Sequence, residues 1–231
     1  MRWMVGSLLG LSVVLTSACQ KAPSPVAAGL RPATAAVRSA QADFYPVTPG
    51  STWEYQLHQR QANGDTQTRP MTIAIDSAKT RADGVVEAVT SRRYQSWAPP
   101  ATRVLKFPDR VVLSRLSDPE DGPSITVLKL PLEPGAAWPG RPLEGGHKET
   151  IRAIGREAVT VPAGTFEAYR VDHELAYANG DSDTLHYWYA PGVGVVKMIE
   201  RSTLYQNGQP LKLQVTGELE RYTIGRVQLS R

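Results

Sequence analysis

The sequence is short of the residues that build disulfides, metal centres and nucleophilic active sites. Its 231 residues include one cysteine, which excludes an intramolecular disulfide, a thiolate metal site and a CxxC redox pair. The four histidines form neither an HxH nor an HExxH spacing, and the sequence has no GxSxG elbow, SxxK motif or P-loop. We therefore expect no cofactor and no metal, and no motif predicts an enzyme.

Most of the chain also lacks an excess of positive charge. The whole sequence has a formal net charge of +4 and a pI near 9.2, but Arg2, Lys21, Arg31 and Arg38 all precede residue 44. From residue 44 onward, 22 basic side chains stand against 21 acidic ones. A domain with this balance is not expected to bind nucleic acid.

The charge is nevertheless unevenly distributed along the chain. Residues 79–115 have a net charge of +5, and residues 116–183 have a net charge of −6. Oppositely charged neighbours stabilise a sheet, so we expect these two segments to pair with each other. The alternative is that the basic segment faces the phosphate groups of a lipid surface.

The only long uncharged apolar run lies at the N-terminus. Residues 5–18 follow Arg2 and contain no charge, but they are too few for a membrane-spanning helix, which needs about 20 residues. Their length is typical of the apolar region of a secretory signal. The run ends in LTSAC, residues 15–19, which resembles the lipobox of bacterial lipoproteins.

This resemblance implies that residues 1–18 are removed and that Cys19 carries the acyl chains, palmitate among them, that anchor the protein. Gln20 follows the cysteine, and in lipoproteins of bacteria with two membranes a residue other than Asp there implies the outer membrane. The alternative is an ordinary cleaved signal with an incidental cysteine. Residues 19–43 are rich in Ala and Pro and are predicted to be a tether.

From residue 44 to residue 231 the pattern predicts a single β-rich domain. Apolar residues alternate with polar ones in several runs, which is typical of antiparallel strands with one buried face. Turn-forming Asn-Gly and Asp-Gly pairs separate these runs. We expect about ten to twelve strands and an all-β, or nearly all-β, fold. The runs with the clearest alternation are Trp53–Tyr55–Leu57, Met71–Ile73–Ile75, Tyr169–Val171–His173–Leu175 and Leu211–Leu213–Val215.

A short motif, PGxxW, occurs twice. Pro49-Gly50 precedes Trp53, and Pro134-Gly135 precedes Trp138. The repeat could mark two similar halves of one sheet, or it could be a Pro-Gly turn used twice beside a core tryptophan. We favour the second interpretation.

Together with VPAGTF at residues 161–166 and WYAPGVG at residues 188–194, this motif resembles a set found in uncharacterised secreted bacterial lipoproteins. The resemblance brings no established activity. It implies a β-rich protein of the lipoprotein-carrier kind with a curved antiparallel half-barrel, and a sandwich is the other arrangement considered. The turns in VPAGTF and WYAPGVG are expected to have a structural role, because Pro and Gly end strands and permit tight turns and bulges.

Four residues are predicted to form a contact surface for a ligand or partner. Tyr94 and Trp97 lie in a proline-bearing stretch between Arg93 and Arg103. The alternative is a loop that packs over the end of a barrel. His173 has the parity of a buried face, where a hydrogen-bonded core histidine is the more common case.

These observations lead to three functional hypotheses. The first is a non-enzymatic outer-membrane lipoprotein, facing the periplasm, whose curved sheet binds an apolar ligand, such as a lipid, or an envelope protein. The second is a scaffold or assembly factor that binds a partner through an exposed edge strand. The third is an envelope hydrolase that uses the carboxylate pairs Asp172–Glu174 and Asp181–Asp183, which are more often a wetted strand face and a turn.

Overall fold

Every regular element of the described chain is a β-strand. The structure is a computed structural model and describes residues 42–61, 64–141, 148–206 and 208–225. This confirms the all-β prediction, and none of these residues forms a helix long and apolar enough to cross a membrane. The strands are β1 (Thr52–Arg60), β2 (Thr66–Thr80), β3 (Val86–Tyr94), β4 (Thr102–Lys106), β5 (Arg110–Arg115), β6 (Ser124–Lys129), β7 (Ala137–Pro139), β8 (Lys148–Val161), β9 (Gly164–Ala176), β10 (Ser182–Ala190), β11 (Gly194–Gln206) and β12 (Gln209–Thr223).

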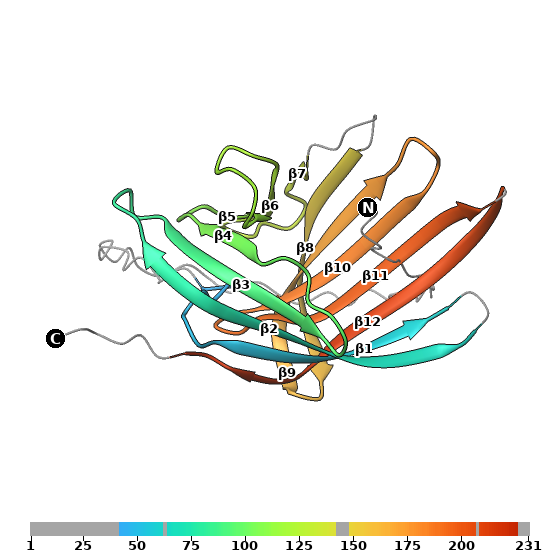
Figure 1. Cartoon of the computed structure of the whole chain (residues 1–231), viewed down its shortest axis with the longest axis horizontal. Helices are drawn as coiled ribbons and strands as arrows, with labels where there is room; N and C mark the ends of the chain where they lie inside the picture. The colour runs from blue at the N-terminus through green and yellow to red at the C-terminus, as the bar shows by residue number, and fades with distance from the viewer. Residues whose placement is uncertain (1–41, 62–63, 142–147, 207, 226–231) are drawn as a thin grey trace, which may run out of the picture.

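The twelve strands form one antiparallel sheet that curves into a nearly closed, barrel-like shape (Figure 1). Strands that are neighbours in sequence pair with each other, except that β1 pairs with β12 and leaves β6 and β7 as the edges. Of the two arrangements considered from the sequence, the structure has the single curved sheet and not the sandwich. The sheet therefore has a concave face, a convex face and two wings that meet at the β1–β12 pair.

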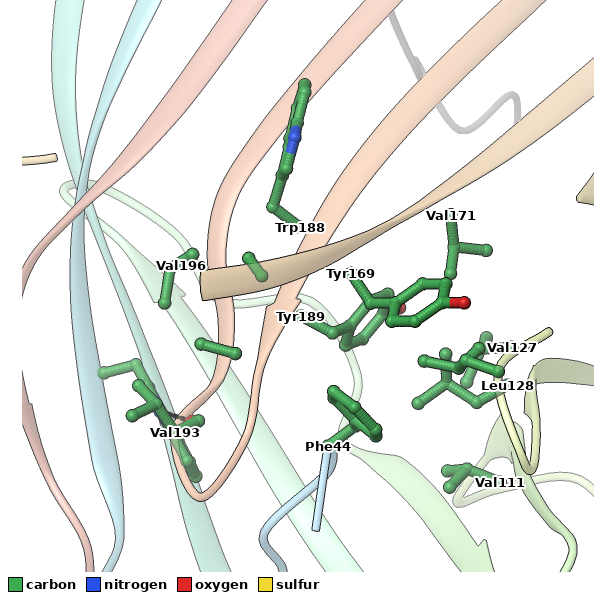
Figure 2. Close-up of a cluster of buried hydrophobic side chains, with 14 of the residues drawn as sticks. Phe44, Val111, Val127, Leu128, Tyr169, Val171, Trp188, Tyr189, Val193 and Val196 are labelled. Carbon is green, nitrogen blue, oxygen red and sulfur yellow. Dashed lines mark hydrogen bonds between the residues drawn. The ribbon is translucent and has the colours of Figure 1, made fainter. Parts of the chain in front are cut away.

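The core fills the concave face at one end of the sheet, where β1 begins and β10 ends. Phe44, in the segment before β1, packs edge-on against Tyr169 of β9, with 6.1 Å between the ring centroids. Figure 2 shows Phe44 between the aromatic rings of β9 and β10 and the valine and leucine side chains of β5 and β6, which belong to the other wing. Both wings thus share one core at this end, which we call the filled end. Other fully buried members are Val111, Leu128, Val171, Val196 and Leu219.

The two PGxxW segments have the same backbone hydrogen bonds. The Gly50 amide donates to Ile75 O of β2, and the Ile75 amide donates to Ser51 O; in the second copy Gly135 donates to Ala153 O of β8, and Ala153 donates to Ala136 O. Both glycines have φ between +80° and +86°, where a side chain is strained. In both copies the strand bulges just after the paired residue.

This correspondence extends to the whole sheet and favours the interpretation that we did not prefer from the sequence. Strands β1–β6 and β7–β12 are two halves with the same order of hairpins. The first strand of the first half, β1, pairs with the last strand of the second half, β12. The equivalent pair, β7 with β6, is not formed. Trp138 of β7 spans this seam, because its indole N–H donates to Thr126 O of β6 at 2.7 Å.

The expected pairing of the basic and acidic segments was largely wrong. The Arg81–Glu120 ion pair joins residues 79–115 to residues 116–183. Most other pairs of these segments are local, such as Lys79–Glu87 and Arg170–Asp172. The reason is topological, since β3 and β4 lie in one wing and β8 to β10 lie in the other.

The predicted signal, Cys19 and nearly all of the predicted tether lie outside the described residues. Asp43, the last residue assigned to the tether, already belongs to the folded structure. Its carboxylate accepts a hydrogen bond from Lys106 Nζ of β4 at 2.7 Å, and its carbonyl accepts one from the Gly192 amide of the β10–β11 turn. The segment before β1 therefore links the two wings at the filled end.

Candidate functional site

The concave face changes character beyond the core. Leu57 of β1 and Met198 of β11 meet above Gly217 of β12, where a Cβ atom would lie only 2.9 Å from Leu57 Cδ2 and 2.7 Å from Met198 Cγ. Both side chains pack against the core. Further along β10 to β12, away from the filled end, five apolar side chains on the same face are half-buried, and we call them the concave strip. They are Leu185, Leu204, Leu211, Leu213 and Val215.

The structure divides the four predicted contact residues between the two faces. Tyr94 is on the concave face, opposite Met71, and its ring stacks on Trp97 at 4.9 Å with 9° between the planes. Trp97 is 54% exposed. Arg93 and Arg103 belong to the convex face, since Arg93 pairs with Thr72 and Arg103 with Ser114. The four residues therefore do not form one surface, although their binding role stays a prediction.

Arg103 is already occupied by contacts within the protein. Its two terminal nitrogens donate to Leu116 O at 3.2 Å and to Asp118 O at 3.1 Å. Its Nε lies 3.7 Å from a carboxylate oxygen of Glu87. These bonds hold the loop between β5 and β6, so the side chain has a structural role.

His173 points into the concave face, as its parity predicted. Only 4% of its surface is exposed, and its Nδ1 lies 3.0 Å from Glu149 Oε1 of β8. Burial raises the pKa of the Glu149 carboxyl, but the bonds from His173 and from the Arg141 amide lower it below its ordinary value. Since an ionised carboxylate only accepts, Nδ1 holds the hydrogen, and Nε2 is buried without a hydrogen-bond partner.

This pair makes stability depend on pH. A carboxyl whose pKa is lower in the folded state than in the unfolded state stabilises the fold above the unfolded value, about 4.5, and this contribution is lost as the pH falls through the folded-state pKa. We expect the free energy of unfolding of Glu149→Gln to fall less steeply below about pH 4.5 than that of the wild type. Urea titrations at several pH values would measure it, and equal slopes would contradict the assignment.

The convex face of the same strands has a second polar cluster. Arg170 donates through Nε and Nη2 to both oxygens of Asp172, at 2.7 and 2.8 Å. His186 Nδ1 lies 2.8 Å from Asp172 Oδ1. Burial raises the pKa of Asp172, whereas His186 and Arg170 lower it below the ordinary value of an aspartate. The carboxylate is thus fully engaged by two donors.

The two members of the second carboxylate pair considered for hydrolysis, Asp181 and Asp183, are bound by different groups of the protein. Asp183 is buried on the concave face and accepts bonds from Ser202 Oγ at 2.6 Å and from Tyr177 Oη at 2.7 Å. Asp181 lies in the β9–β10 turn, where it accepts from Asn179 Nδ2 at 2.9 Å. The turn interpretation of this segment is therefore confirmed. Within the described ranges, no group of three or more His, Cys, Asp or Glu side chains could hold a metal ion.

Comparison with known proteins adds a family match and two structural neighbours. Residues 151–205 match the DUF3108-like family. The matched segment contains β9, β10 and most of β8 and β11, and two of the three sequence motifs, VPAGTF and WYAPGVG, lie within it. Both of these motifs form hairpin turns, between β8 and β9 and between β10 and β11. No curated protein sequence matches the chain significantly.

Two solved structures are similar to the chain. A candidate lipoprotein from Parabacteroides distasonis has a TM-score of 0.51 and 18% identity, over 79% of this chain and 99% of its own. A candidate exported protein with a YmcC-like fold from Bacteroides fragilis has a TM-score of 0.43 and 16% identity, with the same two coverages. The first of these shows that the fold occurs in another protein.

Arg92 is a residue of the concave face that we did not predict from the sequence. Arg92 counted only as part of the basic segment, yet it shares its face with Ala88, four positions before it in β3, and with Tyr94, two positions after it. The alternation of residues 86–94 contained this signal. It was hidden because the polar residues Thr90 and Arg92 occupy the inward positions of this strand.

Proposed function

We propose that the protein is a non-enzymatic lipoprotein of the bacterial outer membrane whose concave face binds an apolar or amphiphilic ligand in the periplasm. The concave strip is the observation that supports this most directly. Apolar side chains on the inner face of a curved sheet lower the free energy when another element or a ligand covers them. Among the described residues no helix and no second sheet lies over the strip.

Support for the location comes from the N-terminus and from the structural neighbour. The LTSAC sequence at residues 15–19 resembles a lipobox, and the neighbour with the higher TM-score is itself described as a candidate lipoprotein. Acyl chains on Cys19 would anchor the domain, and two or more chains make such an anchor stable.

The scaffold alternative needs an exposed edge strand. The two edges of this sheet are short, with six residues in β6 and three in β7. They also face each other across the seam that Trp138 spans. This arrangement leaves little edge for β-augmentation by a partner, so ligand binding is the better-supported proposal.

A photo-crosslinking experiment with a matched control tests the proposal. Benzoylphenylalanine would replace Leu213, on the concave strip, or Lys212, its exposed neighbour on the opposite face of β12, in the full chain produced in cells. After irradiation, mass spectrometry would identify the adducts. We expect lipid adducts at position 213 and none at position 212.

Two outcomes would contradict ligand binding by the concave face. Position 213 could give no lipid adduct, or the two positions could react equally. A discrete protein adduct at position 213 in place of a lipid would indicate that the concave face binds an envelope protein.

A further inference from the structure

Arg92 stands on the concave face at the boundary between the core and the concave strip. In the register of the sheet it lies opposite Ile73 of β2, which lies opposite the buried Trp53 of β1. Residues directly opposite each other share a face. The Arg92 side chain is nevertheless exposed. An arginine among core positions is uncommon, because a charge needs a partner or water there.

The groups that surround the Arg92 guanidinium are phenols. Desolvation by the surrounding sheet lowers the pKa of Arg92, but Tyr94, Tyr187 and Tyr45 raise it by more, and Tyr94 also forms a side-chain hydrogen bond with it. These tyrosines come from β3, from β10 in the opposite wing and from the segment before β1. Among the described residues, no carboxylate forms a salt bridge with Arg92. The positive charge is therefore held between the two wings without an acidic counter-ion from the described residues.

The hydroxyl groups near Arg92 differ in what they can still donate. The Tyr55 hydroxyl is used, since it donates to Val195 O at 2.8 Å. Burial raises the pKa of Tyr45 to about 12, despite the opposing effect of Arg92, so this phenol keeps its proton. A phenol that stays protonated can donate to an anion, and hydrogen bonds to a charged group are the stronger kind.

The opposite wall is acidic and restricts where an anion can lie. Burial raises the pKa of Tyr187, and Glu200 raises it further, as does Glu149 more weakly. Glu200 lies on the concave face between Leu185 of β10 and Val215 of β12, so its carboxylate repels an anion beside these residues. The oxyanion is therefore expected on the side of Arg92, whose strand β3 belongs to the opposite wing.

We propose that Arg92 binds the oxyanion head, a carboxylate or a phosphate, of a single-chain amphiphile whose apolar chain lies along the concave strip. This inference rests on the proposed function and names its ligand class. From Val215 to Leu211 the strip continues for about 13 Å at the rise of a β-strand. The concave strip begins on the far side of Leu57 and Met198. Leu57 itself lies further from the filled end than Trp53, the β1 residue in the same row as Arg92.

The test compares two arginines of the same strand. The full-length protein, with the N-terminus that the cell gives it, would be placed in nanodiscs of a neutral phospholipid. Isothermal titration would then measure binding of octanoate, octyl phosphate and octanol, with empty nanodiscs as the blank. The variants are Arg92→Gln and Arg93→Gln, which remove the same charge from the concave face and from the convex face.

We expect the wild type and Arg93→Gln to bind at least one of the two anions about tenfold to hundredfold more tightly than octanol, which is the range for a hydrogen bond to a charged group. Arg92→Gln should lose this preference and keep its affinity for octanol. Tighter binding of octanoate than of octyl phosphate would indicate a fatty acid, and the reverse a single-chain phosphate ester such as a lysophospholipid.

Two results would overturn the inference. Arg92→Gln could retain the preference for the anion, or Arg93→Gln could lose it to the same extent. Equal binding of all three probes by the wild type would reject the anion site while leaving the proposed function intact. Binding of none would reject both. Thermal unfolding of each variant would show that it is folded, and Arg92→Lys, which keeps the charge, should retain part of the preference.

Discussion

Replacing Cys19 with serine is expected to abolish acylation and to move the protein out of the outer-membrane fraction. On the proposed assignment the Cys19 thiol receives the lipid, and a serine hydroxyl cannot replace it. Each buried CH₂ of an acyl chain contributes about 0.8 kcal/mol, so loss of several chains removes nearly all of the membrane affinity. Cells grown with an alkyne-labelled palmitate would give the measurement, since the label and the membrane fraction can be followed together.

The matched control for this variant is Ser17→Ala, which keeps a small residue before the cysteine. It should leave both the label and the fractionation unchanged. A Cys19→Ser protein that still incorporates palmitate, or that stays in the outer membrane, would contradict the lipoprotein assignment. Both positions precede the predicted domain of residues 44–231, so neither change is expected to disturb its sheet.

Truncation of Trp138 is expected to be the most destabilising single change at the seam. Its side chain is 4% exposed, and its indole N–H supplies the 2.7 Å hydrogen bond to β6. Removal of a buried Trp side chain costs about 3–5 kcal/mol, a large fraction of the 5–15 kcal/mol typical of a folded protein. Trp138→Phe keeps the ring and loses the hydrogen bond, so we expect it to cost about 1 kcal/mol.

Urea unfolding followed by far-UV circular dichroism would measure both variants. Trp97→Ala is the control, since that side chain is 54% exposed and touches one tyrosine. If Trp138→Ala were no less stable than Trp97→Ala, the seam would not depend on this contact. Hydrogen exchange adds a local readout, because β6 should lose protection in Trp138→Ala more than β3 does.

Local patterns predicted the strands and the direction of many side chains. The alternation of Trp53 and Tyr55 gave the inner face of β1, and the parity of His173 gave its burial, because both depend on neighbours in sequence. The turn at Asn179-Gly180, before Asp181, was also predicted from the sequence. These features follow from the two-residue period of a strand and from the conformational freedom of glycine.

Features that depend on long-range register could not be predicted. Nothing near Thr52 or Thr223 indicates that they lie opposite each other. For the same reason, we expected the basic and acidic segments to pair, because the sequence does not show that they lie in different wings. Arg92 could be proposed as a binding residue only from the structure, which places Tyr45 and Tyr187 near it from distant parts of the chain. The alternation of apolar and polar residues can be read from a single sequence, but the pairing of β1 with β12 cannot.

The pairing of β1 with β12 ties the rate of folding to the order in which the chain emerges. Strand β1 finds β2 at once through a hairpin, but its second partner is the last strand to be made. Contacts this distant in sequence carry a large loop-closure entropy and are formed slowly. If the chain is exported N-terminus first, the unpaired edge of β1 remains open until residues 209–223 arrive, so the final strand determines when the protein becomes safe from aggregation.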